Sequence, residues 1–136
     1  MAGYRPGRKP EPIKVRVLAE RQGVPSVAAA QVNNADQWNK LSPGEKAGYV
    51  QGLNDTSNFI FTNDDLATGI IKAARTRCLL QTKMAPNLLS DVITTAYAKI
   101  PEFRAQPPMI VYFNRLAEIC RPIIIEERAR FGLPPQ

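Results

Sequence analysis

The chain has 136 residues, of which 44% are hydrophobic, so it is long enough to bury one core and too apolar to be disordered throughout. Its formal net charge of +6 is uneven, because residues 1–27 carry six basic and two acidic side chains, whereas the remainder carries twelve basic and ten acidic ones. No apolar run reaches the roughly 18 residues that span a membrane, and no apolar block follows the first basic residues. We therefore expect neither a membrane span nor a secretory signal.

The first 33 residues are predicted to form an extended basic arm. Prolines at positions 6, 10 and 12 disfavour both a helix and an interior strand. The stretch 13–18 alternates apolar and basic residues, a pattern that suits a short edge strand or pairing with the sheet of a partner. Such an arm can bind nucleic acid or an acidic protein surface, or it can be a solvated tail. Its candidate contact residues are Arg5, Arg8, Lys9, Lys14, Arg16 and Arg21.

Helical signals begin directly after the arm. The short sequence ADQWNKL is a candidate helix in which Trp38 and Leu41 pack together. Ser42 then starts a longer helix that extends through the sequence NDTSNFIF, because Pro43 suits the first helical position and Glu45 completes a capping box with Ser42.

Two glycines, Gly48 and Gly52, lie four residues apart inside this second helix. Each lowers the helix stability by roughly 1 kcal/mol relative to alanine. Two interpretations follow: another backbone packs closely against the glycines, or they are simply poor helix residues.

The next helix is predicted to begin at Thr62 or Asn63 and to continue to Cys78. Its charges match the helix dipole, with acidic residues in the first turn and basic residues near the end, namely Asp64, Asp65, Lys72, Arg75 and Arg77. One face repeats every four residues and is predicted to point to the core, with Leu66, Ile70, Ala74 and Cys78.

Prolines mark the remaining helices. Pro86 opens a helix that ends at Pro101 and is predicted to bury Leu89, Val92 or Ile93, Ala96, Tyr97 and Ile100. Pro108 opens another, with an apolar stripe of Met109, Tyr112, Phe113, Leu116 and either Ile119 or Cys120. Pro122 then forces a kink or a restart, and the last helix should end at Phe131 with Gly132 at C′. The sequence predicts an all-α compact bundle of four to five helices, formed by a single domain over residues 34–136.

The residue types that carry most catalysis and metal binding are missing or unpaired. The chain has no histidine, which removes the usual triads, and two cysteines without histidine make a poor zinc site. No glycine-rich phosphate loop is present. The carboxylate pair Asp64/Asp65 should complement a helix dipole, and Glu126/Glu127 is expected on a solvent face. We predict a non-enzymatic protein with no catalytic residue, cofactor or metal.

Cys78 and Cys120 are the only two cysteines, and both fall on apolar stripes towards the ends of predicted helices. An even number of cysteines is compatible with one bridge, which in the chain-entropy model would stabilise the fold by about 4 kcal/mol for a loop of this length. In a reducing cytosol the same residues would be small buried hydrophobes. The spacing alone leaves both interpretations open.

The order of four short motifs resembles the small two-cysteine helical proteins of the periplasm. These motifs are GYVQG (48–52), Cys78, AYAKIPEF (96–103) and LAEIC (116–120), and the similarity covers about residues 35–121. The group includes HdeA-like acid-stress chaperones and, more closely, the immunity proteins that neutralise type VI secretion effectors. The resemblance implies a five-helix-type fold, a bridge between Cys78 and Cys120, a periplasmic location and function by binding a protein. The chain departs from the group in having a basic arm where an export signal is expected.

A second resemblance concerns the two ends of the chain. GRKPEP (7–12) and FGLPP (131–135) are similar to the termini of a phage small-terminase family, whose members bind DNA for packaging. This resemblance implies a virion or DNA-packaging component whose basic arm contacts DNA or a neighbouring subunit. The expected lack of a secretory signal agrees with a place in the cytoplasm or the virion. The leading expectation is a non-enzymatic protein-binding module, and the phage component is the alternative.

Overall fold

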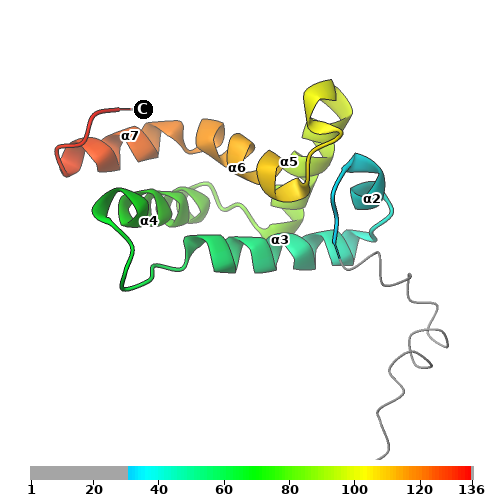
Figure 1. Ribbon diagram of the computed structural model, residues 1–136, viewed down its shortest axis with the longest axis horizontal. Helices are drawn as coiled ribbons and strands as arrows, with labels where there is room; N and C mark the ends of the chain where they lie inside the picture. Colours follow the sequence, from blue (N-terminus) through cyan, green and yellow to red (C-terminus); the bar gives the residue numbers. More distant parts are fainter. Residues whose placement is uncertain (1–30, 136) are drawn as a thin grey trace, which may run out of the picture. The chain divides into compact units, whose positions relative to one another are not determined.

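The computed structural model describes residues 31–135, and these contain helices and turns without any strand, which confirms the all-α fold class. Its helices are α2 (Ala35–Asn39), α3 (Pro43–Asn58), α4 (Leu66–Gln81), α5 (Pro86–Lys99), the 3₁₀ helix η2 (Pro101–Phe103), α6 (Pro108–Ile119) and α7 (Arg121–Arg130) (Figure 1). This part of the chain therefore has six α-helices, since the short α2 forms and the chain restarts at Pro122. The six basic residues of the predicted arm and the possible strand 13–18 lie outside the described residues.

The start of α3 follows the sequence prediction. The hydroxyl oxygen of Ser42 accepts a hydrogen bond from the amide of Glu45 at 3.1 Å, and the Glu45 carboxylate accepts one from the amide of Ser42 at 2.9 Å. This reciprocal pair is a capping box, and Pro43 occupies the first turn where no amide is needed. These bonds lower the pKa of the Glu45 carboxyl.

The interpretation that another backbone packs closely on Gly48 and Gly52 is wrong. A Cβ atom added at either position would have no neighbouring atom within 4 Å. Both glycines lie on the open side of α3, so low helix propensity is their main structural effect.

Helix α4 begins and ends later than the sequence predicts. Its N-cap is Asp65, whose carboxylate accepts the amide of Thr68 at 2.7 Å, and it continues to Gln81. Asp64 therefore precedes the helix, and the three basic residues expected near its end, Lys72, Arg75 and Arg77, lie in its middle. The predicted stripe is buried at Ile70, Ala74 and Cys78, whereas Leu66, in the first turn, is 59% exposed. The first turn of α4 therefore leaves Leu66 open to solvent, and the core face begins one turn later, at Ile70.

The last two helices meet at Cys120, where Pro122 produces a restart and not a kink. Cys120 ends α6 and precedes α7, in whose first turn Pro122 needs no amide partner. Gly132 has a φ of 72° and its amide bonds to the carbonyl of Ala129, while the amide of Leu133 bonds to the carbonyl of Arg128. This pair of bonds is the Schellman arrangement that the glycine predicted.

The apolar stripe of α6 is rotated relative to the prediction. Tyr112, Leu116 and Cys120 are buried as expected, but Met109 is 44% exposed and Val111 is fully buried instead. The face of α6 that meets the core is therefore centred between Val111 and Tyr112. Several neighbouring residues of α6 are equally apolar, so the sequence alone did not determine which face is buried.

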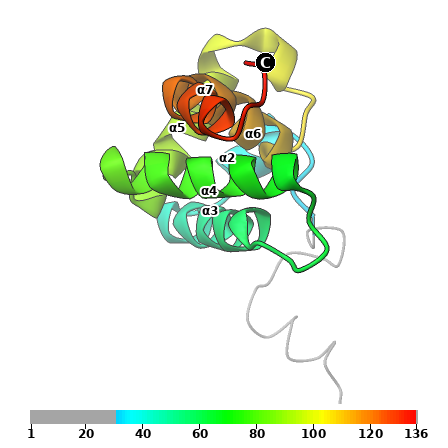
Figure 2. The same cartoon turned by 90° about the vertical axis from the view of Figure 1, so that its left-hand side faces the viewer.

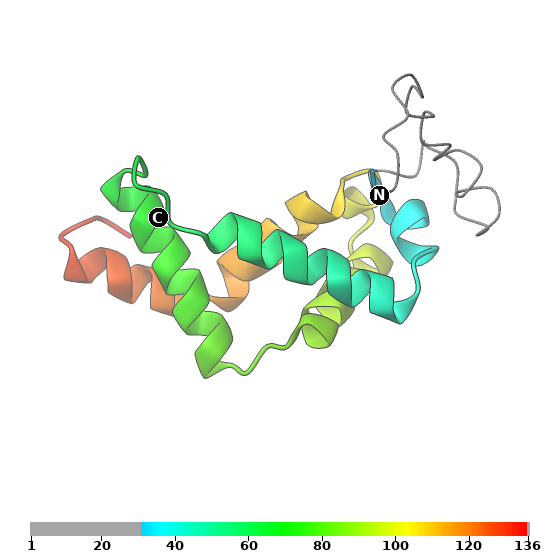
Figure 3. The same cartoon turned by 90° about the horizontal axis from the view of Figure 1, so that it is seen from below.

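The core lies where α3, α4, α5 and α6 converge. Its largest fully buried side chains include Trp38, Val50, Ile93, Tyr112 and Leu116. Figures 1 and 2 both show α4 between α3 and α7, and both neighbours contact it. Figure 3 shows α3 running across α5, with which it packs extensively. Burial of these side chains supplies most of the stabilisation of such a bundle.

Buried polar side chains join helices that are distant in sequence. The indole nitrogen of Trp38 donates to the hydroxyl of Thr94 at 2.9 Å, which fixes the short α2 on α5. The hydroxyl of Tyr112 donates to the amide oxygen of Asn54 at 2.7 Å, which joins α6 to α3. Burial raises the pKa of Tyr112, so this hydroxyl keeps its proton when it donates.

Candidate functional site

The connection between α3 and α4 exposes three consecutive large apolar side chains. Phe59, Ile60 and Phe61 are 60%, 54% and 50% exposed. We call residues 59–65 the FIF loop. Isolated exposed apolar residues are ordinary, but adjacent ones at a loop tip point to a binding surface.

Sequence reasoning missed this loop because it extended α3 through Phe61. The helix ends at Asn58, and Phe59 leaves it with a ψ of 123°. The run NDTSN before the loop was the available signal, since short polar side chains compete for backbone hydrogen bonds and weaken a helix. In the structure the hydroxyl of Ser57 donates to the backbone carbonyl of Asn54 at 3.4 Å, and the side-chain amide nitrogen of Asn58 donates to the side-chain oxygen of Asn54 at 2.7 Å.

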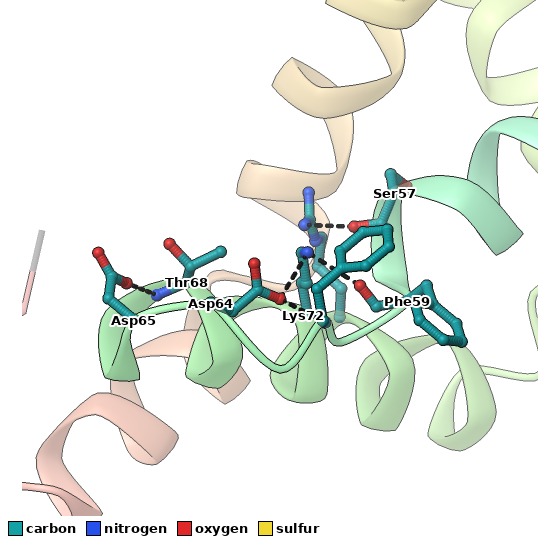
Figure 4. Close-up of polar contacts among 8 residues, drawn as sticks. Ser57, Phe59, Asp64, Asp65, Thr68 and Lys72 are labelled. Atoms are coloured by element: carbon teal, nitrogen blue, oxygen red, sulfur yellow. Dashed lines mark hydrogen bonds and ion pairs between the residues drawn. The ribbon is translucent and has the colours of Figure 1, made fainter.

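Lys72, from α4, holds the backbone of the FIF loop. Its ammonium nitrogen donates to the carbonyl oxygen of Phe59 and to a carboxylate oxygen of Asp64, both at 2.8 Å (Figure 4). The same Asp64 oxygen accepts the amide of Phe61 at 2.8 Å. Only 12% of the Lys72 side chain and 14% of the Asp64 side chain are exposed, so solvent competes weakly with these bonds.

The electrostatics of the loop follow from this geometry. The hydrogen bond from Lys72, and then the bond from the Phe61 amide, lower the pKa of the Asp64 carboxyl below its usual value. The bonds from Thr68 lower the pKa of Asp65 in the same way. Both carboxylates are therefore ionised near neutral pH and brace the loop and the start of α4.

Aromatic contacts order the exposed rings themselves. The rings of Phe59 and Phe61 meet edge to face, with centroids 4.9 Å apart. The Lys72 ammonium lies 4.8 Å from the centroid of the Phe61 ring, within the range of a cation–π contact. Two of the three apolar side chains thus have neighbours that restrict their motion while much of their surface faces solvent.

Arg75 ties the end of α3 to the neighbouring helices. Its guanidinium donates to the carbonyl oxygen of Ser57 at 3.2 Å and lies over the Phe113 ring of α6, 4.9 Å from the ring centroid. Burial lowers the pKa of Arg75, although an arginine stays charged at any physiological pH. The residues on both sides of the loop are therefore anchored to the core.

The two cysteines come together in the core. Cys78 and Cys120 are fully buried and joined by a disulfide, with their Cα atoms 5.6 Å apart. The bond links α4 to the junction of α6 and α7, the pairing that the periplasmic resemblance implied. Its place within the packed bundle makes it a structural cross-link.

Of the two carboxylates that the sequence predicted on a solvent face, Glu126 lies there and Glu127 does not. Glu127 accepts from the guanidinium of Arg77, and only 11% of its side chain is exposed. Glu126 also pairs with Arg77, at 3.2 Å, but 61% of its side chain remains exposed. The reason is that α7 packs along α4, which turns Glu127 towards Arg77.

No protein family model, curated protein or solved structure matches this chain. Within residues 31–135, the helices are too short or too polar to cross a membrane. In the same part of the chain, no group of three acidic or cysteine residues is arranged to hold a metal ion.

Proposed function

We propose that this protein is a non-enzymatic protein-binding module, similar to the effector-immunity and HdeA-like group, and that the FIF loop is its docking element. The observation that carries the proposal is the combination of exposure and order at Phe59, Ile60 and Phe61. The exposed part of an apolar side chain has an unfavourable free energy of hydration. Burying that part in the apolar cleft of a partner removes it from water and favours association.

The order of the loop favours binding. A flexible loop loses conformational freedom when a partner immobilises it, at about 0.5–1.5 kcal/mol for each side chain. In the FIF loop, Lys72 and Asp64 already hold the backbone, and the two phenyl rings already contact each other. The loop therefore loses much of its conformational freedom when the protein folds, before a partner binds.

The size of the gain limits what the loop does. Full burial of a large apolar side chain contributes roughly 1.5–3 kcal/mol, and these three are already about half buried. The loop would then supply a few kcal/mol, enough for an anchor at the centre of an interface. Surrounding surface must supply the remainder of the affinity.

A photo-crosslinking experiment in the native host tests this proposal. A photoreactive phenylalanine analogue replaces Ile60 in one variant and Leu80 in a control, because Leu80 is 74% exposed on α4 but is not in the loop. We expect a defined cross-linked protein with the label at position 60 and none at position 80. The identified protein is then purified for a binding measurement.

The binding measurement compares Ile60→Asp with Leu80→Asp. Each substitution places a charge at an exposed apolar site, so both variants should fold. We expect Ile60→Asp to weaken binding at least tenfold, or about 1.4 kcal/mol, and Leu80→Asp to leave it unchanged. Equal affinity of the two variants and the original chain would remove the loop from the interface.

The charge distribution supports a second candidate, a phage virion or DNA-packaging component. Residues 1–27 have a net charge of +4, six basic minus two acidic, whereas the remainder has +2, twelve minus ten. DNA titration at several salt concentrations tests it, with a control in which the six basic residues of the arm are replaced by glutamine. DNA binding should weaken steeply with salt and be lost in the control. Salt-independent or absent binding counts against DNA as the target.

A further inference from the structure

The outer face of α5 and α6 carries a second feature, separate from the FIF loop. A hollow of about 380 Å³ lies between the two helices. Its apolar lining includes Val92 and Ile119, and Ile119 is 39% exposed. Charged residues of α5 line the same hollow at its two ends, Asp91 and Lys99.

The spacing of these charges is symmetric about Thr95. Asp91 lies four residues before Thr95 and Lys99 lies four residues after it, so both are about one turn away on the same helix face. If a second α5 packs antiparallel with a two-fold axis at Thr95, Asp91 of each copy lies opposite Lys99 of the other. The face is thus complementary to itself, which is the requirement for a two-fold interface.

Charges elsewhere on this face do not oppose such packing. Arg115 and Glu118 of α6 also line the hollow, and they already pair with each other at 3.3 Å. Within residues 31–135, Asp91 and Lys99 make no ion pair with another side chain. The α5 charges are the ones left to be matched by a partner, and one copy supplies one of each sign.

We propose that this protein forms a two-fold dimer through antiparallel α5 helices, with Thr95 at the axis and Asp91 of each copy paired with Lys99 of the other. The contact would remove the exposed parts of Val92 and Ile119 from water. The dimer does not depend on the FIF loop, so it stands or falls separately from the proposed function.

Charge reversal tests the pairing in the full chain by sedimentation equilibrium. Asp91→Lys or Lys99→Asp alone places like charges opposite each other twice in each dimer, and we expect the dissociation constant to rise by about tenfold or more. The double variant Asp91→Lys/Lys99→Asp restores opposite charges and should return to within about threefold of the original value. Asp55→Lys and Lys83→Asp, which make the same charge changes at exposed sites on other elements, should have no effect.

Cross-linking at the axis gives an independent measurement. Helices packed about 8–10 Å apart bring the Cα atoms of two residues on the axis within the range of a disulfide. Thr95→Cys should therefore form a covalent dimer under mild oxidation, whereas Thr56→Cys, at an exposed site on α3, should not. A monomer at all concentrations up to about 1 mM, a dimer insensitive to the reversals, or a double variant as weak as the single ones overturns the proposal.

Discussion

Lys72 and Asp64, eight residues apart in the chain, meet at 2.8 Å and between them hold both ends of the exposed Phe59–Phe61 segment. The lysine bonds to the carbonyl of Phe59, and the aspartate accepts the amide of Phe61. A single pair of side chains therefore fixes the backbone of the loop while leaving its apolar side chains open to solvent.

Substitution of Lys72 by methionine should loosen the loop. Methionine keeps the apolar stem of the side chain but removes the donors to Phe59 and Asp64. We expect faster amide hydrogen exchange at Phe61 and Asp64 and little change in the melting temperature, because the core is untouched. Lys40→Met, which replaces an exposed lysine after α2, is the matched control. Unchanged exchange in Lys72→Met would show that other contacts hold the loop.

Asp64 should titrate below its ordinary pKa of 3.8, because the charged form is stabilised by Lys72 and by the Phe61 amide. The pKa of Asp64 is lower in the folded than in the unfolded protein. Its contribution to the free energy of unfolding is therefore fully present above pH 3.8 and is lost as the pH falls through the folded pKa. NMR titration of the Phe61 amide measures this pKa directly. In Lys72→Met the transition should move to higher pH, and an identical transition in both proteins would contradict the assignment.

Removal of the disulfide should destabilise the fold strongly. The bond between Cys78 and Cys120 spans a separation of 42 residues, for which the chain-entropy model gives about 4 kcal/mol. Urea unfolding of Cys78→Ala/Cys120→Ala, beside the oxidised original, measures the difference in the free energy of unfolding. The original chain treated with a reductant is the control, since it lacks the bond but keeps both side chains. A loss under about 1 kcal/mol in both samples would mean that packing alone holds α4 to the α6–α7 junction.

Replacement of Gly48 or Gly52 by alanine should stabilise the protein. The added Cβ meets open space at both positions, and alanine is favoured over glycine in a helix by about 1 kcal/mol. Gly132→Ala should have the opposite effect, because the φ of Gly132 is +72°, a conformation that costs other residues roughly 1–2 kcal/mol. Thermal unfolding of the three variants measures the predicted stabilisation and the predicted destabilisation. A lower melting temperature of Gly48→Ala or Gly52→Ala would reveal a neighbouring group at that site.

Much of the local structure could be predicted from the sequence. Ser42 with Glu45, Pro86, Pro108 and Gly132 mark helix ends through interactions that reach no more than about five residues along the chain. Such signals act wherever the helix finally packs. The all-α class followed from them, together with the apolar spacing of the intervening segments.

Contacts between distant segments decided the candidate site. From its sequence, Phe61 is one more apolar residue of a helix. In the structure it lies in a loop, because Lys72 of the following helix binds the carbonyl of Phe59 and the carboxylate of Asp64. The sequence predicts Glu127 as a surface carboxylate, whereas the packing of α7 along α4 places it beside Arg77. The spacing of the two cysteines was compatible with a bridge or with free thiols, and only the approach of α4 to the end of α6 joined them. Each of these outcomes depends on which helix faces meet, because burial and charge pairing are properties of the packed bundle and not of any one segment.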